Sequence, residues 1–385
     1  MAELNETPRG NRIHIAFFGL RNAGKSTLVN AFTGQDIAIV SDVPGTTTDP
    51  VSKAMEILPL GPCLVTDTAG LDDAGELGAQ RVEKTLKVLE ATDIAVWVTG
   101  NEELRMKNEE LWKSRFLDSC SRLRVKVLEF SRGDSVEELK KKIAAVKIEE
   151  SMPGLLDGLV KPGDRVLCVV PIDESAPKGR LILPQQQVIR ACLDIRATVT
   201  VCQPEDMRRE TEDASRRPDL VITDSQAFGE VNRVLSASTS HLHLTSFSVL
   251  FARQKGDLAE YVKGLKAIKD LKDGDTVLVA EGCTHHRQCN DIGSVKIPKA
   301  LEKLSGKKLK FEFVSGGTFE VSAPVAEDRD GTVKLVVHCG GCMLTRREML
   351  RRIARTKEAG VPIVNYGLVL AMANGIDIHS LIPTP

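Results

Sequence analysis

The stretch from Gly19 to Ser26, GLRNAGKS, constrains the fold of this chain more than any other feature. It matches the pattern G-x-x-x-x-G-K-[ST] at every fixed position, follows an apolar run at Ile13–Phe18 and leads into a helical pattern at Lys25–Phe32. In this context backbone N–H groups point inward at phosphates, and the helix N-terminus adds partial positive charge. The sequence therefore predicts a phosphate-binding loop (P-loop) in an α/β domain.

Two side chains of this loop have predicted chemical roles. Lys25 reaches the outer phosphates of a nucleotide, and the Ser26 hydroxyl is placed to bind Mg²⁺. The other residues predicted to contact the nucleotide in this stretch are Gly19, Asn22, Ala23, Gly24 and Thr27.

Two downstream motifs extend the predicted nucleotide site. The run DTAG follows a short apolar strand, which puts Asp67 near the metal ion and the amide of Gly70 near a γ-phosphate. The run GTTTD at 45–49 lies between this motif and the P-loop. A hydroxyl from Thr46 or Thr47 can complete the Mg²⁺ coordination and order this switch loop only when the γ-phosphate is present.

The runs PGTTTDP at 44–50 and DTAGL at 67–71 resemble the switch sequences of the TrmE–Era-like GTPases. In potassium-activated members of that branch, an asparagine of the P-loop helps to hold a monovalent cation, and the resemblance carries this K⁺ role to Asn22. Leu71 follows DTAG, so no glutamine there orients the attacking water. We therefore expect slow GTP hydrolysis without an activating ion or partner.

The motif that reads guanine is missing. GTPases carry NKxD after a late strand, and this sequence has none. The pattern after the strand ending at Val98 gives one helix, one strand and one last helix, so about one strand–helix unit is absent. Either the run SRGD from Ser131 is a degenerate version with Asp134 as base reader, or the motif is deleted. We favour deletion, because the helix after Ser131 runs directly into the next domain, and we expect weak guanine specificity.

The whole chain reads as α/β, and its length of 385 residues favours two or three domains. A Gly- and Pro-rich stretch at Ser151–Asp164 marks a boundary. We predict a shortened GTPase-type domain at 1–150, a small α/β domain for packing or self-association at 160–264, and a third α/β domain at 265–385.

Charge and composition narrow the partners and the compartment. Lys and Arg number 52 against 53 Asp and Glu, and aromatic residues make up 4%, so the chain lacks both a basic excess and stacking platforms for nucleic acid. Apolar runs are strand-sized, so we expect no membrane span. Met1–Arg12 is polar, which predicts no secretory signal and a cytoplasmic location. Nine cysteines in that compartment favour free thiols and a metal site over disulfides.

Two groups of Cys and His follow two predicted strands of the C-terminal part. The ends of two strands can converge at one sheet edge, and C-x-x-C spacing lets two thiolates face one centre, with glycines allowing N–H groups to approach cluster sulfurs. Spacing alone cannot separate an iron–sulfur cluster from a tetrahedral zinc site, since both metals accept thiolate and imidazole. The candidate ligands are Cys283, His285, His338, Cys339 and Cys342.

The pattern C-x-H…H-C-x-x-C behind a TrmE–Era-like domain resembles the HydF family of FeFe-hydrogenase maturation proteins. The runs APKGRLILPQ, PDLVITDSQ and VPIVNYG extend the resemblance over nearly the whole chain. It implies that the middle domain dimerises and that the last domain binds a [4Fe–4S] cluster through Cys283, Cys339 and Cys342. His285 or His338 would hold the fourth iron, or that iron would stay open.

The resemblance also implies a scaffold or carrier. It would receive a diiron precursor made with the radical-SAM maturases HydE and HydG and deliver it to apo FeFe-hydrogenase, with slow GTP hydrolysis. The alternative is a ribosome- or tRNA-associated GTPase with a C-terminal zinc-binding module. The shared switch sequences favour that alternative, whereas the near-zero net charge and the few aromatics stand against it.

Overall fold

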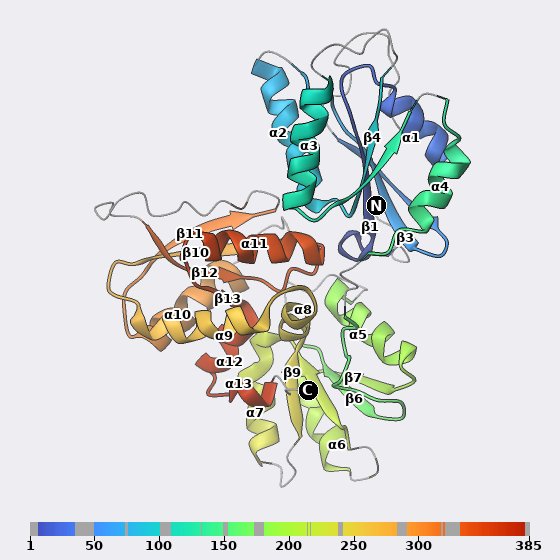
Figure 1. The fold of residues 1–385 in the computed structure, drawn as a ribbon. Coiled ribbons are helices and arrows are strands. Elements are labelled where there is room, and N and C mark those ends of the chain that lie inside the picture. The colour runs from blue at the N-terminus through green and yellow to red at the C-terminus, as the bar shows by residue number, and fades with distance from the viewer. Residues whose placement is uncertain are drawn as a thin grey trace. The chain divides into compact units, whose positions relative to one another are not determined.

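The computed structural model describes most of the chain as two compact units, Met1–Ser151 and Met152–Pro385 (Figure 1). The described residues are 7–34, 50–73, 76–100, 109–131, 133–148, 153–172, 181–213, 215, 217–237, 242–282, 291–316, 319 and 332–381.

The first unit contains a five-stranded sheet with the order β2-β3-β1-β4-β5. The strands β1, β3, β4 and β5 are parallel, and β2 pairs antiparallel with β3. Its strands are β1 (Ile13–Phe18), β2 (Val51–Ile57), β3 (Gly61–Asp67), β4 (Ile94–Val98) and β5 (Lys126–Phe130), and its helices are α1 (Lys25–Thr33), α2 (Glu76–Ala91), α3 (Glu109–Arg122) and α4 (Val136–Ala144).

Both faces of this sheet are covered, and β1 shows why. Ile15 and Phe17 enter a core shared with α1 and α4, whereas Ala16 and Phe18 enter a second core shared with α2 and α3. Figure 1 shows these helix pairs on opposite faces. A strand buried on both faces is apolar at nearly every position, because successive side chains alternate between faces, and β1 is apolar except at His14. The predicted α/β class is confirmed.

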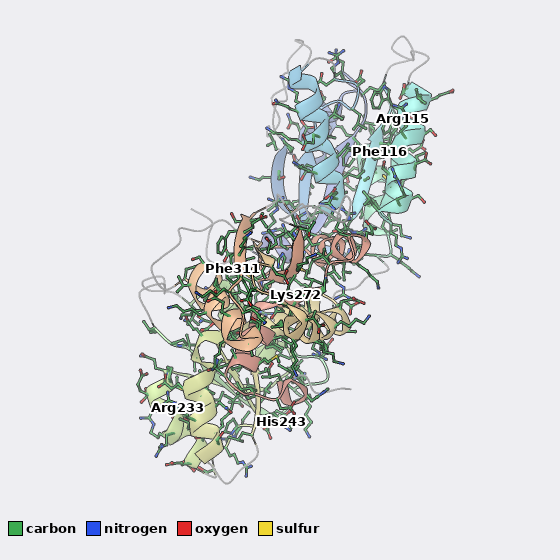
Figure 2. All side chains as sticks on the ribbon, turned by 90° about the vertical axis from the view of Figure 1, so that its left-hand side faces the viewer. Arg115, Phe116, Arg233, His243, Lys272 and Phe311 are labelled. Atoms are coloured by element: carbon green, nitrogen blue, oxygen red, sulfur yellow. The ribbon has the colours of Figure 1, made fainter. Side chains whose placement is uncertain are left out.

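Helix α3 illustrates how one helix divides its surface. Phe116 is buried, with its ring centroid 5.0 Å from those of Phe18 and Trp97, whereas its neighbour Arg115 is exposed (Figure 2). Phe116 therefore lies on the face toward the sheet and Arg115 on the face toward solvent. Sequence analysis did not identify β2, because this edge strand (VSKAMEI) is mostly half-exposed and mixes polar with apolar residues.

The second unit contains two four-stranded sheets, β7-β6-β8-β9 and β11-β10-β12-β13, and every strand pair in them is parallel. The strands are β6 (Arg165–Val169), β7 (Thr198–Cys202), β8 (Leu220–Thr223), β9 (His243–Ser246), β10 (Thr276–Glu281), β11 (Lys310–Ser315), β12 (Val333–His338) and β13 (Ile363–Asn365). The helices are α5 (Leu183–Asp194), α6 (Met207–Glu212), α7 (Phe228–Ala237), α8 (Phe247–Lys255), α9 (Leu258–Ala267), α10 (Ile297–Ser305), α11 (Arg346–Glu358), α12 (Tyr366–Ala373) and α13 (Ile378–Leu381).

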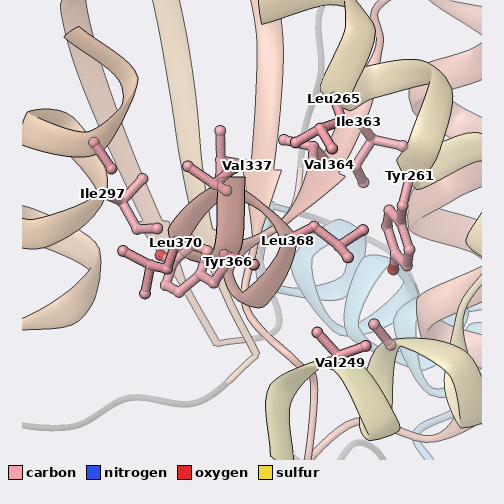
Figure 3. Packing of buried hydrophobic residues seen from close by; sticks show 14 of the residues in the cluster. Val249, Tyr261, Leu265, Ile297, Val337, Ile363, Val364, Tyr366, Leu368 and Leu370 are labelled. Carbon is pink, nitrogen blue, oxygen red and sulfur yellow. The ribbon is translucent and has the colours of Figure 1, made fainter. Parts of the chain in front are cut away.

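One buried cluster joins these two sheets. It includes Val221 of β8 and Val337 of β12. Val249 of α8 and Tyr261 of α9 belong to the same cluster, and Figure 3 shows them with Val337. The segments 160–264 and 265–385, which we expect to be separate domains, thus share a core within one compact unit. Their boundary stays a prediction.

Among the helices of the described ranges, none combines the length and the apolar character needed to cross a membrane.

Candidate functional site

The P-loop joins β1 to α1 with the backbone geometry that its sequence predicts. Gly19 has a φ of +155°, and a Cβ there would lie 2.5 Å from the carbonyl oxygen of Val98. Asn22 and Gly24 also have positive φ, at 57° and 87°. Position 19 therefore requires glycine, because any Cβ would be too close to the carbonyl oxygen of Val98. The loop leads into the N-terminus of α1, where backbone N–H groups can bind phosphate.

Lys25 lies buried at the start of α1. Its Nζ donates to the carbonyl oxygen of Leu20 at 2.7 Å and to that of Gly19 at 3.4 Å. Burial lowers the pKa of Lys25 to about 8, although Asp67 and the more remote acids Asp72 and Asp73 raise it. The ammonium thus lies within the loop, close to where the predicted outer phosphates would bind.

The side chains of Ser26 and Asp67 are in contact, although the two residues are 41 positions apart in the sequence. The Ser26 Oγ donates to Asp67 Oδ2 at 2.6 Å, at the carboxyl end of β3. Burial raises the pKa of Asp67, whereas the Ser26 hydrogen bond and the Lys25 charge lower it. Within the described part of the chain, Asp67 Oδ1 is buried without a hydrogen-bond partner. The Ser26 hydroxyl and the Asp67 carboxylate, with its Oδ1 free of hydrogen bonds, fit the oxygen ligands that Mg²⁺ prefers.

The DTAG motif packs directly on the P-loop. A Cβ at Gly70 would lie 2.6 Å from Cγ of Arg21, and the N–H of Leu71 donates to Gly19 O at 3.2 Å. Arg21 also forms an ion pair at 3.5 Å with Asp73, whose side chain is buried. Sequence analysis missed this Arg21–Asp73 contact; the acids directly after DTAGL were its only signal. Of the remaining predicted contacts, Ala23 is half-buried and Thr27 exposed on α1.

The turn after β5 contains the alternative base reader. Since β5 lies beside β4 and parallel to it, this turn lies at the same sheet edge as the P-loop. Asp134 is exposed there, and its Oδ2 accepts the N–H of Ser131 at 2.7 Å. One carboxylate oxygen of Asp134 is therefore already used within its own turn.

The two candidate cysteine groups follow neighbouring strands. β10 and β12 are parallel partners, with Ala280 opposite His338, so their carboxyl ends meet at one edge. The N–H of Gly282 donates to Cys339 Sγ at 3.2 Å, and the N–H of Cys339 donates to Ala280 O at 3.0 Å. The residue before Cys283 therefore contacts Cys339 directly. A thiolate sulfur that accepts a backbone N–H is typical of iron–sulfur sites, so this donor set fits such a cluster.

Four predicted site residues lie outside the described residues. Within the described ranges, Cys339 and Cys342 are half-buried, and no group of three or more candidate metal ligands is complete. The four residues are Thr46, Thr47, Cys283 and His285.

His338 is fully buried, and both of its ring nitrogens have partners. Nδ1 lies 2.8 Å from Cys339 O, and Nε2 lies 2.9 Å from an Nη of Arg352. Because a carbonyl only accepts and a guanidinium only donates, Nδ1 must carry the proton and Nε2 must accept. Burial first, and then the Arg352 charge, lower the pKa of His338 to about 3. In this arrangement His338 is neutral, and its place as a possible fourth ligand stays a prediction.

Lys255, at the end of α8, is another residue that sequence analysis missed. It is fully buried, and its Nζ donates to three carbonyl oxygens of the loop after β12: Leu344 at 2.7 Å, Cys342 at 3.0 Å and Gly341 at 3.4 Å. Hydrogen bonds from a charged donor contribute roughly 1.5–3 kcal/mol each. Unpaired, such a buried charge would cost several kcal/mol. The three carbonyl oxygens therefore stabilise the buried Lys255 ammonium within the loop.

Three family models match the chain. Residues 155–256 match the hydrogen maturase F dimerization domain, residues 259–382 match the hydrogen maturase F tetramerization domain, and residues 14–125 match the 50S ribosome-binding GTPase. The first two lie almost end to end and together account for nearly all of the second unit.

Two GTPases are similar to part of this chain. The tRNA modification GTPase MnmE of Bacteroides thetaiotaomicron is 30% identical over 132 residues, which is 34% of this chain and 28% of MnmE. The GTPase Der of Wolinella succinogenes is 41% identical over 99 residues, which is 25% of this chain and 20% of Der. The chain thus spans well under two thirds of either relative.

Among solved structures, Era of Aquifex aeolicus bound to GDP and AlF4⁻ aligns with 53% of this chain and 97% of Era, at 19% identity and a TM-score of 0.29.

Proposed function

Because this chain belongs to the HydF family of hydrogenase maturation proteins, we propose that it is a scaffold coupled to slow GTP hydrolysis. It binds a [4Fe–4S] cluster and a diiron precursor, and it delivers the precursor to apo FeFe-hydrogenase. One observation carries the proposal: the ends of β10 and β12 meet, and the Gly282 N–H donates to Cys339 Sγ.

The cluster ligands in this proposal are Cys283, Cys339 and Cys342. His285 is the candidate for the fourth position, because both ring nitrogens of His338 are already bonded within the protein. When bound, the cluster supplies one iron with a replaceable ligand, at which cargo can attach. The protein's part is to hold the three thiolates and to direct N–H groups at their sulfurs.

The nucleotide site has a separate role in this proposal. Lys25 contacts the outer phosphates, while Ser26 and Asp67 hold Mg²⁺ and are supported by their 2.6 Å contact. Thr46 or Thr47 completes the coordination, and Asn22 helps to hold K⁺. Nucleotide state changes the order of the switch loop and thereby biases partner binding.

The partners follow from the family. We propose a homodimer formed through residues 155–256, the segment that matches the dimerization domain. The radical-SAM maturases HydE and HydG supply the precursor, and apo FeFe-hydrogenase receives it. The alternative, a ribosome- or tRNA-associated GTPase with a zinc module, is not favoured. The match to MnmE covers 34% of the chain, whereas residues 155–256 and 259–382 match hydrogen maturase F.

Anaerobic metal analysis of the purified chain tests this function. A [4Fe–4S] scaffold contains about four irons per chain and absorbs visible light. Reconstitution with ferrous iron and sulfide should reach that ratio with less than one zinc. A colourless protein that binds one zinc per chain and takes up no iron would reject the scaffold and restore the zinc-module alternative.

Guanine preference provides a second test. Because NKxD is absent and Asp134 Oδ2 is bonded to Ser131 N–H, we expect GTP and ATP to bind with affinities within about tenfold of each other. Competition between labelled GTP and unlabelled ATP measures this ratio. A preference for GTP of a thousandfold would contradict the expectation. Asp134→Ala would then show whether the exposed carboxylate reads the base.

A further inference from the structure

The loop that carries Cys339 and Cys342 rests on α8, a helix from the other sheet of the second unit. A Cβ at Gly340 would lie 3.3 Å from the backbone of Ser248, near the start of α8. Arg346, just after the loop, donates to the carbonyl oxygen of Gln254 at the other end of the helix. The candidate ligand loop is therefore seated along a helix that lies about 90 residues earlier in the sequence.

Lys255 is the charged centre of this contact. Its three acceptors, Gly341, Cys342 and Leu344, all belong to the loop. A neutral amine has two N–H groups and an ammonium has three, so three acceptor carbonyls match the charged form. The same ammonium lies 5.5 Å from the ring centre of Phe251, one turn earlier on α8. No acidic side chain is within salt-bridge distance of it among the described residues, so the carbonyls stabilise the charge.

We propose that Lys255 is a positioning residue: it holds the Cys339–Leu344 loop in its ligating conformation and places a positive charge beside the cysteine site. This inference rests on the proposed cluster function. It goes further because it assigns part of the metal site to the segment that matches the dimerization domain, whereas the cysteines lie in the segment that matches the tetramerization domain. The cysteine loop is then coupled mechanically to the segment proposed to form the dimer.

The charge has a separate consequence from the hydrogen bonds. Reduction adds an electron to a cluster, and a nearby positive charge favours the reduced form, since net charge and hydrogen bonding set cluster potentials. Loss of the charge should lower the potential, whereas loosening of the loop alone should accelerate metal loss. The two effects can be measured separately.

The test uses the full chain with three variants. Lys255→Met removes the charge and the donors at similar length, Lys255→Arg keeps the charge, and Lys266→Met is a matched control at an exposed lysine of α9. Circular dichroism of each metal-free variant first establishes that it is folded.

The metal-free proteins report on the loop. We expect Lys255→Met to accelerate the alkylation of Cys339 and Cys342 about tenfold. Loss of one charge-assisted hydrogen bond changes the equilibrium constant for local opening of the loop by at least that factor. Peptide mass spectrometry resolves the rates at the two cysteines. The control should match the unaltered chain. Equal rates in Lys255→Met would overturn the positioning role.

The reconstituted proteins report on the charge. Chelator-driven iron loss should be about tenfold or more faster in Lys255→Met, the range typical of outer-sphere ligand partners. The midpoint potential should fall by about 59 mV, which corresponds to tenfold for one electron. Lys255→Arg should restore the potential. An unchanged potential in Lys255→Met would overturn the electrostatic role. If the unaltered chain takes up no iron, the cluster proposal fails, whereas the alkylation result still decides on the loop.

Discussion

Replacement of Lys25 by alanine should reduce the turnover of GTP at least about a hundredfold, because loss of a preorganised donor at a developing charge typically has that effect. Lys25 is buried, and its Nζ is already directed into the P-loop by Leu20 and Gly19 carbonyls. No other lysine in the described ranges of the first unit is buried. Steady-state phosphate release measures the loss.

The same variant tests whether the two sites are separable. Iron content after reconstitution should be unchanged in Lys25→Ala, since Cys339 and Cys342 lie in the second compact unit. Lys141→Ala, at an exposed position on α4, is the control for loss of a lysine elsewhere in the first unit. Turnover in Lys25→Ala that equals the control would show that the P-loop lysine is not required.

Replacement of Cys339 by serine should abolish the iron–sulfur cluster. A neutral hydroxyl cannot substitute for the thiolate that carries the ligand charge. The Gly282 N–H would also lose the sulfur to which it donates at 3.2 Å. We expect iron to fall from about four per chain to below about one, with loss of the visible absorbance. Cys342→Ser should behave in the same way.

A matched control distinguishes ligand loss from general damage. Cys202 is half-buried like Cys339 and Cys342 and lies in the same unit, on β7, but it has no predicted ligand role. Burial raises the pKa of Cys202 to about 11, so it is a thiol at neutral pH. Cys202→Ser should retain the iron. Retention of iron in Cys339→Ser would reject Cys339 as a ligand.

The P-loop could be predicted from sequence because its chemistry is local. Eight consecutive residues fix the backbone, and the flanking apolar strand and helix fix the context. The meeting of Ser26 and Asp67 followed from two strong motifs at adjacent parallel strands. The cysteine groups were predicted at strand ends for the same reason, and β10 and β12 prove to be neighbours.

The sequence could not predict residues that contact the cysteine site but lie far from its motifs in the sequence. Lys255 lies in the last turn of α8 together with another basic residue, Arg253, yet it is fully buried. Its partners are carbonyl oxygens, which every residue has, so no sequence pattern marks the contact. Asn365 is also buried, and its Nδ2 donates a hydrogen bond to the backbone carbonyl oxygen of His338 at 3.4 Å.

The sequence by itself thus determined the α/β class, the P-loop and the two cysteine groups, because short motifs carry both their residue types and their backbone geometry. Only the tertiary structure decided the state of His338 and the environment of the cysteine loop. By its place in the motif His338 is a candidate fourth ligand, and this stays a prediction, whereas its tautomer follows from Arg352 on α11, which donates to Nε2. The hydrogen-bond partners of a buried ring nitrogen or carbonyl oxygen depend on how elements far apart in the sequence pack together. The spacing of residues within a short motif does not determine that packing.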